Sequence, residues 1–145
     1  MNRLVSKLQQ ELEGKRGRAA LEAAVRVLKE GDPRYTWVGI YLLEGNELVL
    51  GPYLGRPTPH TRIPIEQGIC GAAARERQTL VVPDVSADPR YLACSLQTRS
   101  EIVVPVFAEG RVVGEIDIDS DFPDAFGAAD RDLLERAAAL IAQSL

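Results

Sequence analysis

Two cysteines and a run of alternating acidic residues are the side chains of this sequence best suited to chemistry. Glu115, Asp117 and Asp119 alternate with glycine and isoleucine in the stretch from 111 to 120. Successive side chains of a β-strand point to opposite faces, so a strand here would place all three carboxylates on one face. We therefore expect an acidic face on this strand, with the apolar residues turned the other way.

A further carboxylate, Glu101, is predicted to join this face from the preceding strand. Residues 108–110 separate the two strands and are typical of a hairpin loop with Gly110 at positive φ. A three-residue loop sets Glu101 opposite Asp117, whereas a two-residue loop would break that pairing. Like charges on neighbouring strands repel. The cluster of Glu101, Asp117 and Asp119 therefore indicates a surface for a cation or a ligand ammonium, unless it is the wet side of an antiparallel sheet.

Of the two cysteines, Cys94 is the stronger candidate for a nucleophile. It lies in a long connection from 86 to 99, and long connections of this kind are frequently functional. Arg90 and Arg99 are close to it in the sequence and favour its thiolate form. Cys70 lies near the first turn of a short helix, where a thiol pKa can be lowered, but free cysteine is among the most buried residue types. We expect Cys70 to be buried.

The single histidine, His60, gives only a weak signal. It ends a polar loop with two prolines and has no cysteine or carboxylate neighbour at metal-ligand spacing. An exposed or hydrogen-bonded role is therefore favoured over chemistry. The spacing of the two cysteines also excludes the CxxC pattern of zinc sites and thioredoxin-like motifs. We predict no metal site.

Length and composition indicate one cytoplasmic domain. The chain has 145 residues, of which 46% are hydrophobic, enough for one core and too few for two ordinary domains. The net charge is −4 and no basic run occurs, which argues against nucleic acid or an anionic membrane as partner. The N-terminus lacks an apolar signal core, and no apolar run approaches the ~20 residues that span a bilayer. In a reducing cytosol the cysteines are expected to be free, catalytic or redox-active.

Periodicity divides the chain into a sheet and a layer of helices. Leucines every four residues predict an amphipathic helix from 2 to 13, and a second apolar stripe predicts a helix from 18 to 30. Residues 1–17 are thus a helical extension, and 18–145 form the core of a single α+β domain. Strands are expected at 35–43, 47–54, 61–65, 79–82, 101–107 and 111–120, and further helices at 68–75 and 128–144.

The strand from 35 to 43 has two apolar faces. Val38 and Ile40 alternate with Trp37 and Tyr41, which share the other face. This pattern favours a central strand with its aliphatic side under helices. The aromatic side lines a pocket or packs as core.

The first helix carries a narrow stripe of Leu4, Leu8 and Leu12. Such a stripe is too small to bury a whole helix, and it could pack with the C-terminal helix across a two-fold axis. On this basis we predict a homodimer.

The order of elements resembles a GAF domain, a small ligand-binding module. In that fold an antiparallel β-sheet carries N- and C-terminal helices on one face and a loop-covered pocket on the other. The likeness spans about residues 18 to 145. Several motifs are similar to the free methionine-(R)-sulfoxide reductase branch: Trp37-Val-Gly-Ile-Tyr41, Leu50-Gly-Pro-Tyr53, Thr61-Arg-Ile63, Gly68-Ile-Cys-Gly71, Val82-Pro-Asp-Val85, Leu92-Ala-Cys94, Ser100-Glu-Ile-Val-Val-Pro105 and Asp117-Ile-Asp-Ser120.

The resemblance implies a pocket for free methionine sulfoxide. Trp37 and Tyr41 would enclose its methylsulfinyl end. The acidic cluster of Glu101, Asp117 and Asp119 would contact its polar groups, and a free ammonium should make the free amino acid a better substrate than a peptide.

The resemblance also assigns the redox steps. Cys94 matches the catalytic cysteine of the family, whose thiolate attacks the sulfoxide sulfur and becomes a sulfenic acid while an acidic side chain protonates the oxygen. The family then forms a disulfide that a thioredoxin-type reductant or another thiol reopens, with no bound cofactor. The usual resolving cysteine is replaced here by His60, which leaves Cys70 as the resolving candidate.

Two other functions stay open for a GAF domain. The chain could be a non-catalytic sensory module that binds an amino acid or an oxidised metabolite without turnover. A nucleotide or tetrapyrrole site is disfavoured, because the acidic pocket repels phosphate and propionate groups and no cysteine stands beside the histidine.

Overall fold

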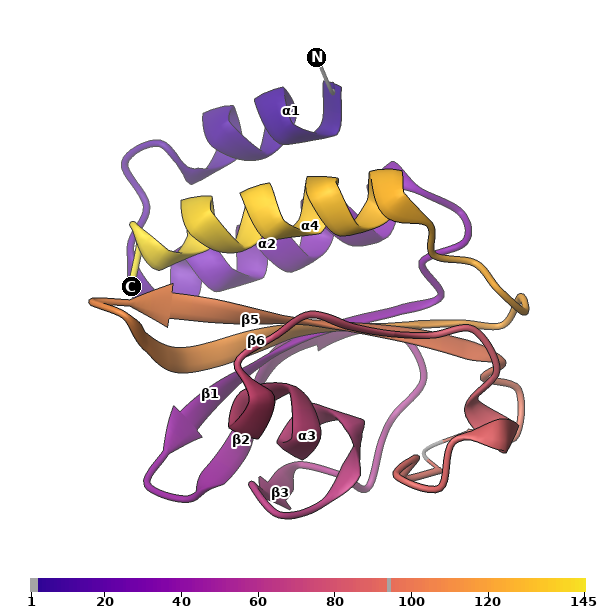
Figure 1. The fold of residues 1–145 in the computed structure, drawn as a ribbon. Helices are drawn as coiled ribbons and strands as arrows, with labels where there is room; N and C mark the ends of the chain where they lie inside the picture. Colours follow the sequence, from indigo (N-terminus) through magenta and orange to yellow (C-terminus); the bar gives the residue numbers. More distant parts are fainter. Residues whose placement is uncertain (1–2, 94) are drawn as a thin grey trace.

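The protein folds around one curled, six-stranded antiparallel sheet (Figure 1). The computed structural model describes residues 3–93 and 95–145. The strand order is β3-β2-β1-β6-β5-β4, and every neighbouring pair is antiparallel. The strands are β1 (Trp37–Glu44), β2 (Glu47–Leu54), β3 (Arg62–Pro64), β4 (Leu80–Val82), β5 (Ser100–Ala108) and β6 (Arg111–Ser120).

The four helices lie on both faces of the sheet. They are α1 (Arg3–Leu12), α2 (Gly17–Gly31), α3 (Gly68–Glu76) and α4 (Ala128–Ala142). Figure 1 shows α1, α2 and α4 stacked on one face, while α3 lies on the other. The predicted α+β class is confirmed, and the predicted element ends agree with the described ones to within two residues. Among the described residues, no helix has the length and apolar character needed to cross a bilayer.

The two faces of β1 explain where the core and the pocket form. Val38 and Ile40 are fully buried in the cluster that the sheet shares with α2 and α4. Trp37 and Tyr41 belong to a second cluster on the opposite face, together with residues of α3. Burial of a large aliphatic side chain contributes about 1.5–3 kcal/mol. The prediction of an aliphatic side under helices is confirmed, and the aromatic side, expected to line a pocket or to pack as core, packs in the second cluster.

The hairpin between β5 and β6 differs from the predicted register. Its loop has two residues, Glu109 and Gly110, with φ of 53° and 75°. A bulge follows at Val113, because Phe107 pairs with Val112 but Val106 pairs with Gly114. The loop length and the bulge together shift the register by two residues.

The pairing of Glu101 with Asp117 was therefore wrong. Glu101 lies opposite Asp119, and Val103 lies opposite Asp117. The side-chain period of a strand is two, so a shift of two residues keeps Glu101 on the predicted face. The acidic cluster survives the change of partner.

The leucine stripe of α1 is covered within its own chain. Leu8 and Leu12 are buried in the core that α2 and α4 share with the sheet, and Leu4 packs against the same core. Figure 1 shows α1 above these two helices. Packing across a two-fold axis is not needed to bury the stripe. The homodimer stays a prediction that has lost this support.

An ionic network ties the start of α4 to the turn before β1. The Arg34 guanidinium donates to Asp32 at 2.6 Å and to Asp130 at 2.7 Å, and the buried Tyr35 hydroxyl also donates to Asp130 at 2.7 Å. The Gly127 amide donates to the same carboxylate at 2.9 Å and so begins the helix. The hydrogen bond from Arg34 lowers the pKa of Asp32. This network holds the helical layer against the end of the sheet that carries Trp37.

Candidate functional site

A pocket lies on the sheet face opposite α1, α2 and α4. Its floor comes from β1, β5 and β6, and its walls come from α3 and the segments around residues 58–63 and 91–92. The five predicted binding residues all line it, namely Trp37, Tyr41, Glu101, Asp117 and Asp119. Cys70 lines the same pocket. The fold thus brings together, from four separate elements, every predicted site residue that the structure describes.

The carboxylates of the pocket are buried. Glu101, Asp117 and Asp119 are 6%, 6% and 3% exposed, respectively. On an ordinary solvated sheet face these side chains would be open to water. The alternative of a wet sheet face is therefore excluded, and the carboxylates form the floor of an enclosed site.

Trp37 is held as one wall of the pocket by contacts on several sides. Its indole stacks on Tyr53 at 5.4 Å between ring centroids, and its Nε1 donates to the Arg56 carbonyl at 3.0 Å. The ring lies over the backbone at Gly39, where an added Cβ would come within 2.3 Å of the indole. Only glycine leaves that space. The position of Trp37 as a pocket wall therefore also requires glycine at residue 39.

Tyr41 forms the wall beside Trp37 and ties the rim of the pocket to the sheet. Its hydroxyl donates to the His60 carbonyl at 2.7 Å. Burial, and then the charge of Asp117, raises the pKa of the Tyr41 hydroxyl, so it remains a donor. The pocket wall and the 58–60 loop are thereby connected.

The electrostatics of the floor favour protons or a cation. Burial raises the pKa of Asp117, and hydrogen bonds with Glu101 and then Cys70 offset part of that rise. A hydrogen bond between the two carboxyl groups requires one of them to carry a proton. Burial, followed by the charge of Asp117, also raises the pKa of Glu115 well above its usual range. A ligand that brings positive charge would relieve this repulsion.

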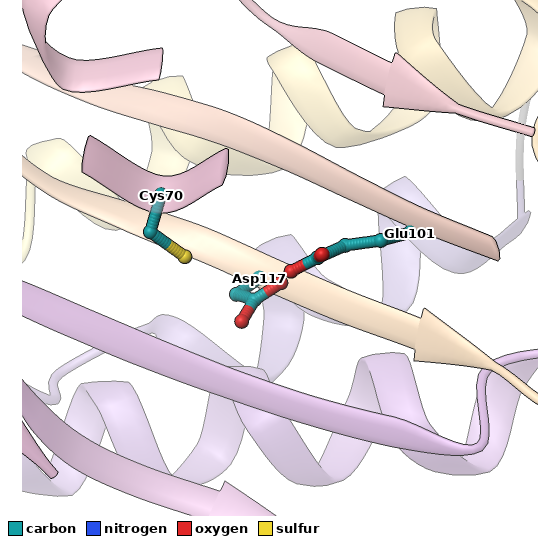
Figure 2. A group of neighbouring side chains, drawn as sticks. All are labelled: Cys70, Glu101 and Asp117. Carbon is teal, nitrogen blue, oxygen red and sulfur yellow. The ribbon is translucent and has the colours of Figure 1, made fainter. Parts of the chain in front are cut away.

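Cys70 is buried, as predicted, and lies on α3 above these carboxylates (Figure 2). Burial, and then the charges of Asp117 and Glu115, raises the pKa of its thiol well above the usual value. The helix N-terminus does not outweigh these effects. Cys70 is therefore a neutral thiol at neutral pH.

Cys94 lies outside the described residues, but its neighbours reach the pocket. Tyr91 and Leu92 line the pocket wall. The His60 Nε2 lies 3.0 Å from the Ala93 carbonyl, which can only accept, so this nitrogen carries the proton. The expected hydrogen-bonded role of the histidine is confirmed. Residues 91 and 92 of this segment thus form part of the pocket wall.

Arg90 has another task than the one expected from the sequence. It forms an ion pair with Asp88 at 2.7 Å and a longer one with Glu76 at 3.7 Å. These contacts fix the turn at 88–91 and engage the guanidinium. We expected Arg90 to favour the Cys94 thiolate, but its guanidinium instead pairs with the carboxylates of Asp88 and Glu76.

Sequence reasoning missed three contributors to the site. Glu115 was placed on the acidic face but given no role, and it is completely buried beside the pocket. Tyr91 and Leu92 were placed in the long connection that holds Cys94 but were given no role of their own, although their apolar type in a polar segment was a signal. Their place in the wall depends on how the connection folds back over α3.

Comparisons with known proteins agree with this geometry. The profile of the GAF domain matches residues 18–145. GAF domain-containing protein A of Dictyostelium discoideum is 37% identical over 139 residues, 95% of this chain and 87% of that protein. A free methionine-R-sulfoxide reductase of Saccharomyces cerevisiae is 39% identical over 112 residues, 74% of this chain and 62% of the yeast protein.

Solved structures show the same architecture at similar identity. A free methionine-R-sulfoxide reductase from Neisseria meningitidis in complex with its substrate superposes with a TM-score of 0.93 at 37% identity, covering 97% of this chain and 85% of that one. A type II free methionine-R-sulfoxide reductase from Thermoplasma acidophilum gives a TM-score of 0.85 at 40% identity, covering 94% and 93%. The family match covers residues 18–145, and the relatives at 37–40% identity share the fold. The chain therefore belongs to the GAF domain family.

Proposed function

We propose that this protein reduces free L-methionine-(R)-S-oxide to methionine, with Cys94 as the nucleophile. The observation that carries the proposal is a pocket lined by Trp37, Tyr41 and three buried carboxylates, with Tyr91 and Leu92, the residues three and two positions before Cys94, in its wall. The similarity to reductases of this name in two organisms supports the same activity.

Recognition of a free amino acid follows from the charge of the pocket floor. A ligand ammonium would neutralise the repulsion among Glu101, Asp117 and Asp119. The aromatic walls of Trp37 and Tyr41 would enclose the methylsulfinyl group. A methionine sulfoxide inside a polypeptide has no ammonium, so it would leave buried carboxylates without a cation.

The pocket must widen to admit this substrate. Its cavity holds about 30 Å³ in the described arrangement, whereas ligand pockets usually measure about 300–1,000 Å³. The lining residues that belong to no helix or strand are Thr58 and His60 in one segment and Tyr91 and Leu92 in another. Substrate entry would therefore move one of these two segments outward.

The first chemical step transfers the sulfoxide oxygen to the cysteine. The Cys94 thiolate attacks the sulfoxide sulfur, the bond from that sulfur to oxygen breaks, and the oxygen, with one added proton, becomes bonded to the Cys94 sulfur as a sulfenic acid. The cysteine is oxidised by two electrons, and the sulfoxide is reduced by two electrons to methionine. The proton for the oxygen would come from the hydrogen-bonded Glu101 and Asp117 pair, because one of these carboxyls holds a proton.

The second step returns Cys94 to its reduced form. Either Cys70 or an external thiol attacks the sulfenic acid, a disulfide forms and water leaves. A thioredoxin-type protein or a small thiol then supplies two electrons. Cys70 is a neutral thiol in the described pocket, so it must lose its proton before it attacks. A cytoplasmic location is proposed from the sequence alone, and the homodimer stays a prediction without the support of the leucine stripe.

The test measures methionine release with dithiothreitol as reductant on three matched substrates. These are the free (R)-sulfoxide, the free (S)-sulfoxide and N-acetylmethionine-(R)-sulfoxide, which lacks only the ammonium. Removing one partner of a buried charge pair costs about 2 kcal/mol or more, so the acetylated substrate should lose at least about 30-fold in kcat/KM. Equal rates on the free and acetylated compounds, or preference for the (S) epimer, would contradict the proposal. Cys94→Ser should abolish turnover.

A sensory module is the second candidate function. GAF domain-containing protein A of Dictyostelium discoideum matches 95% of this chain and 87% of its own length, and its name assigns no reductase activity. In that case the pocket would bind free methionine sulfoxide with unchanged affinity in the wild type and in Cys94→Ser, and neither protein would release methionine.

A further inference from the structure

Three metal-binding side chains converge on the floor of the pocket from three different elements. Cys70 comes from α3, Glu101 from β5 and Asp117 from β6, and one ligand atom of each lies within 4.8 Å of the others (Figure 2). All three side chains are buried. Figure 2 shows the Cys70 sulfur turned toward the two carboxyl groups.

The polar atoms around this cluster are incompletely satisfied. Within the described part of the chain, Asp117 Oδ1 and both carboxyl oxygens of Glu115 are buried without a hydrogen-bond partner. Glu115 is completely buried and lies close enough to Cys70 to interact with its thiol. Unpaired buried carboxylates destabilise a fold unless a proton or a cation compensates them. These oxygens point to a ligand with positive charge and free coordination positions.

The size of the cavity selects a small ligand. About 30 Å³ is available in the described arrangement, which corresponds to roughly one or two water molecules. An amino acid requires the walls to move, whereas a metal ion with one water molecule fits without that movement. The described pocket is therefore better matched to an ion than to the substrate.

We propose that this pocket binds a divalent cation of the zinc class through the Cys70 thiolate and the carboxylates of Glu101 and Asp117. The thiolate favours zinc over magnesium or calcium, which prefer oxygen ligands only. Three protein ligands leave the fourth position of a tetrahedral zinc for water or for Glu115. Ligand atoms around such a zinc lie about 3.5 Å apart, so the side chains close in by about 1 Å.

Binding changes protonation but not oxidation state. The Cys70 thiol and the protonated carboxyl of the Glu101 and Asp117 pair each lose a proton to solvent, zinc–sulfur and zinc–oxygen bonds form, and zinc stays divalent. Neither Cys94 nor turnover takes part. Zinc occupies carboxylates to which the proposed reductase function assigns the substrate ammonium, so zinc and free methionine sulfoxide exclude each other.

The first experiment separates the two cysteines. Cys94→Ser protein is titrated with Zn²⁺ by calorimetry and with Co²⁺ by absorption spectroscopy. The double variant Cys94→Ser/Cys70→Ser, titrated in the same way, is the matched control. Cobalt should give a thiolate charge-transfer band only when Cys70 is present. Loss of an outer-shell partner typically lowers metal affinity about 10- to 100-fold, so loss of a ligand should lower zinc affinity by at least about 100-fold.

A second pair of variants tests the carboxylate ligands and guards against misfolding. Asp117→Asn keeps a neutral amide oxygen in place of the charged ligand, so it should lower zinc affinity by a smaller factor than loss of Cys70, at least about tenfold. Asp121→Asn makes the same change in a carboxylate that instead pairs with Arg56, and it should leave zinc affinity unchanged. Asp117→Asn removes a buried charge, so it should fold, as circular dichroism will show.

Three results would overturn the site. They are a cobalt thiolate band that survives Cys70→Ser, equal zinc affinities of the two Asp→Asn variants, and absence of zinc binding to folded Cys94→Ser protein. None of these measurements depends on enzyme activity. Failure of the zinc site is thus distinguishable from failure of the reductase assignment.

Discussion

Gly39→Ala tests whether the pocket wall depends on the absence of one side chain. Gly39 lies in the middle of β1, and an alanine Cβ there would come within 2.3 Å and 2.6 Å of two atoms of the Trp37 ring. Real contacts at these distances do not occur, so the indole or the strand must shift. The indole also stacks on Tyr53 and donates to the Arg56 carbonyl. Moving it therefore disrupts two further interactions.

The expected cost can be added from these contacts. Overpacking a core site costs about 1–3 kcal/mol. The hydrogen bond contributes about 0.5–1.5 kcal/mol and the aromatic pair a similar amount. Together these contributions come to about 2–6 kcal/mol. Because the strand and the ring share the movement, we expect Gly39→Ala to lower the free energy of unfolding by the lower part of this range, about 2–4 kcal/mol. Substrate affinity should fall with it, since Trp37 is a wall of the pocket.

Urea unfolding measures the stability, and fluorescence reports the cause. Trp37 is the single tryptophan of the chain, so a red-shifted emission of the folded variant would show that the indole has moved toward water. The matched control is the same substitution in a Trp37→Ala background. There the clash is gone, and alanine should be neutral or stabilising by about 0.5–1 kcal/mol, because it replaces glycine in a strand. An equal loss of stability in both backgrounds, or an unshifted emission with a loss below about 1 kcal/mol, would refute the reasoning.

The other predictions concern acid stability, the rim and the buried cysteine. The hydrogen bond from Arg34 lowers the pKa of Asp32 below its value in the unfolded chain. The stability that ionised Asp32 contributes is therefore present above about pH 4 and is lost as pH falls through the lowered pKa. In urea unfolding from pH 7 to 2, the free energy of unfolding of Asp32→Asn should fall less steeply at acid pH than that of the wild type. His60→Ala removes the ring that donates to the Ala93 carbonyl and should lower kcat/KM about two- to tenfold. His60→Gln keeps a donor and should recover part of the lost kcat/KM. Equal activities of the two variants would show that this hydrogen bond does not support turnover. Cys70→Ser should complete one turnover and stall with thioredoxin as reductant but continue with dithiothreitol; unchanged turnover with thioredoxin would show that Cys70 does not resolve.

The sequence predicted side-chain faces better than side-chain partners. The alternation in β1 and β6 identified both the helical side and the pocket side, because a strand with two distinct faces has only two possible orientations. The position of Glu101 along its ladder depended on the loop length and on the bulge at Val113. A bulge is set by how the sheet twists against its neighbours, and no residue type in the hairpin required it.

The cluster of Cys70, Glu101 and Asp117 could not be predicted from the sequence for a similar reason. Sequence motifs reveal metal ligands when they are a few residues apart, and these three are separated by strands and a helix. Burial of Cys70 was predictable from residue type alone. Its distance from the carboxylates was not, since it depends on how closely α3 packs on the sheet.

The bulge at Val113 decides which way a whole strand faces. With the two-residue loop alone, Glu101 would pair with Ile118, because Phe107 pairs with Val112 beside the turn. Glu101 would then point into the aliphatic core beneath the helices, and its neighbours Ser100 and Ile102 would face the pocket floor in its place. One unpaired residue therefore sets the parity of the hairpin. Deletion of Val113 would not merely shorten β6, since it would exchange the inner and outer surfaces of β5 relative to the rest of the sheet.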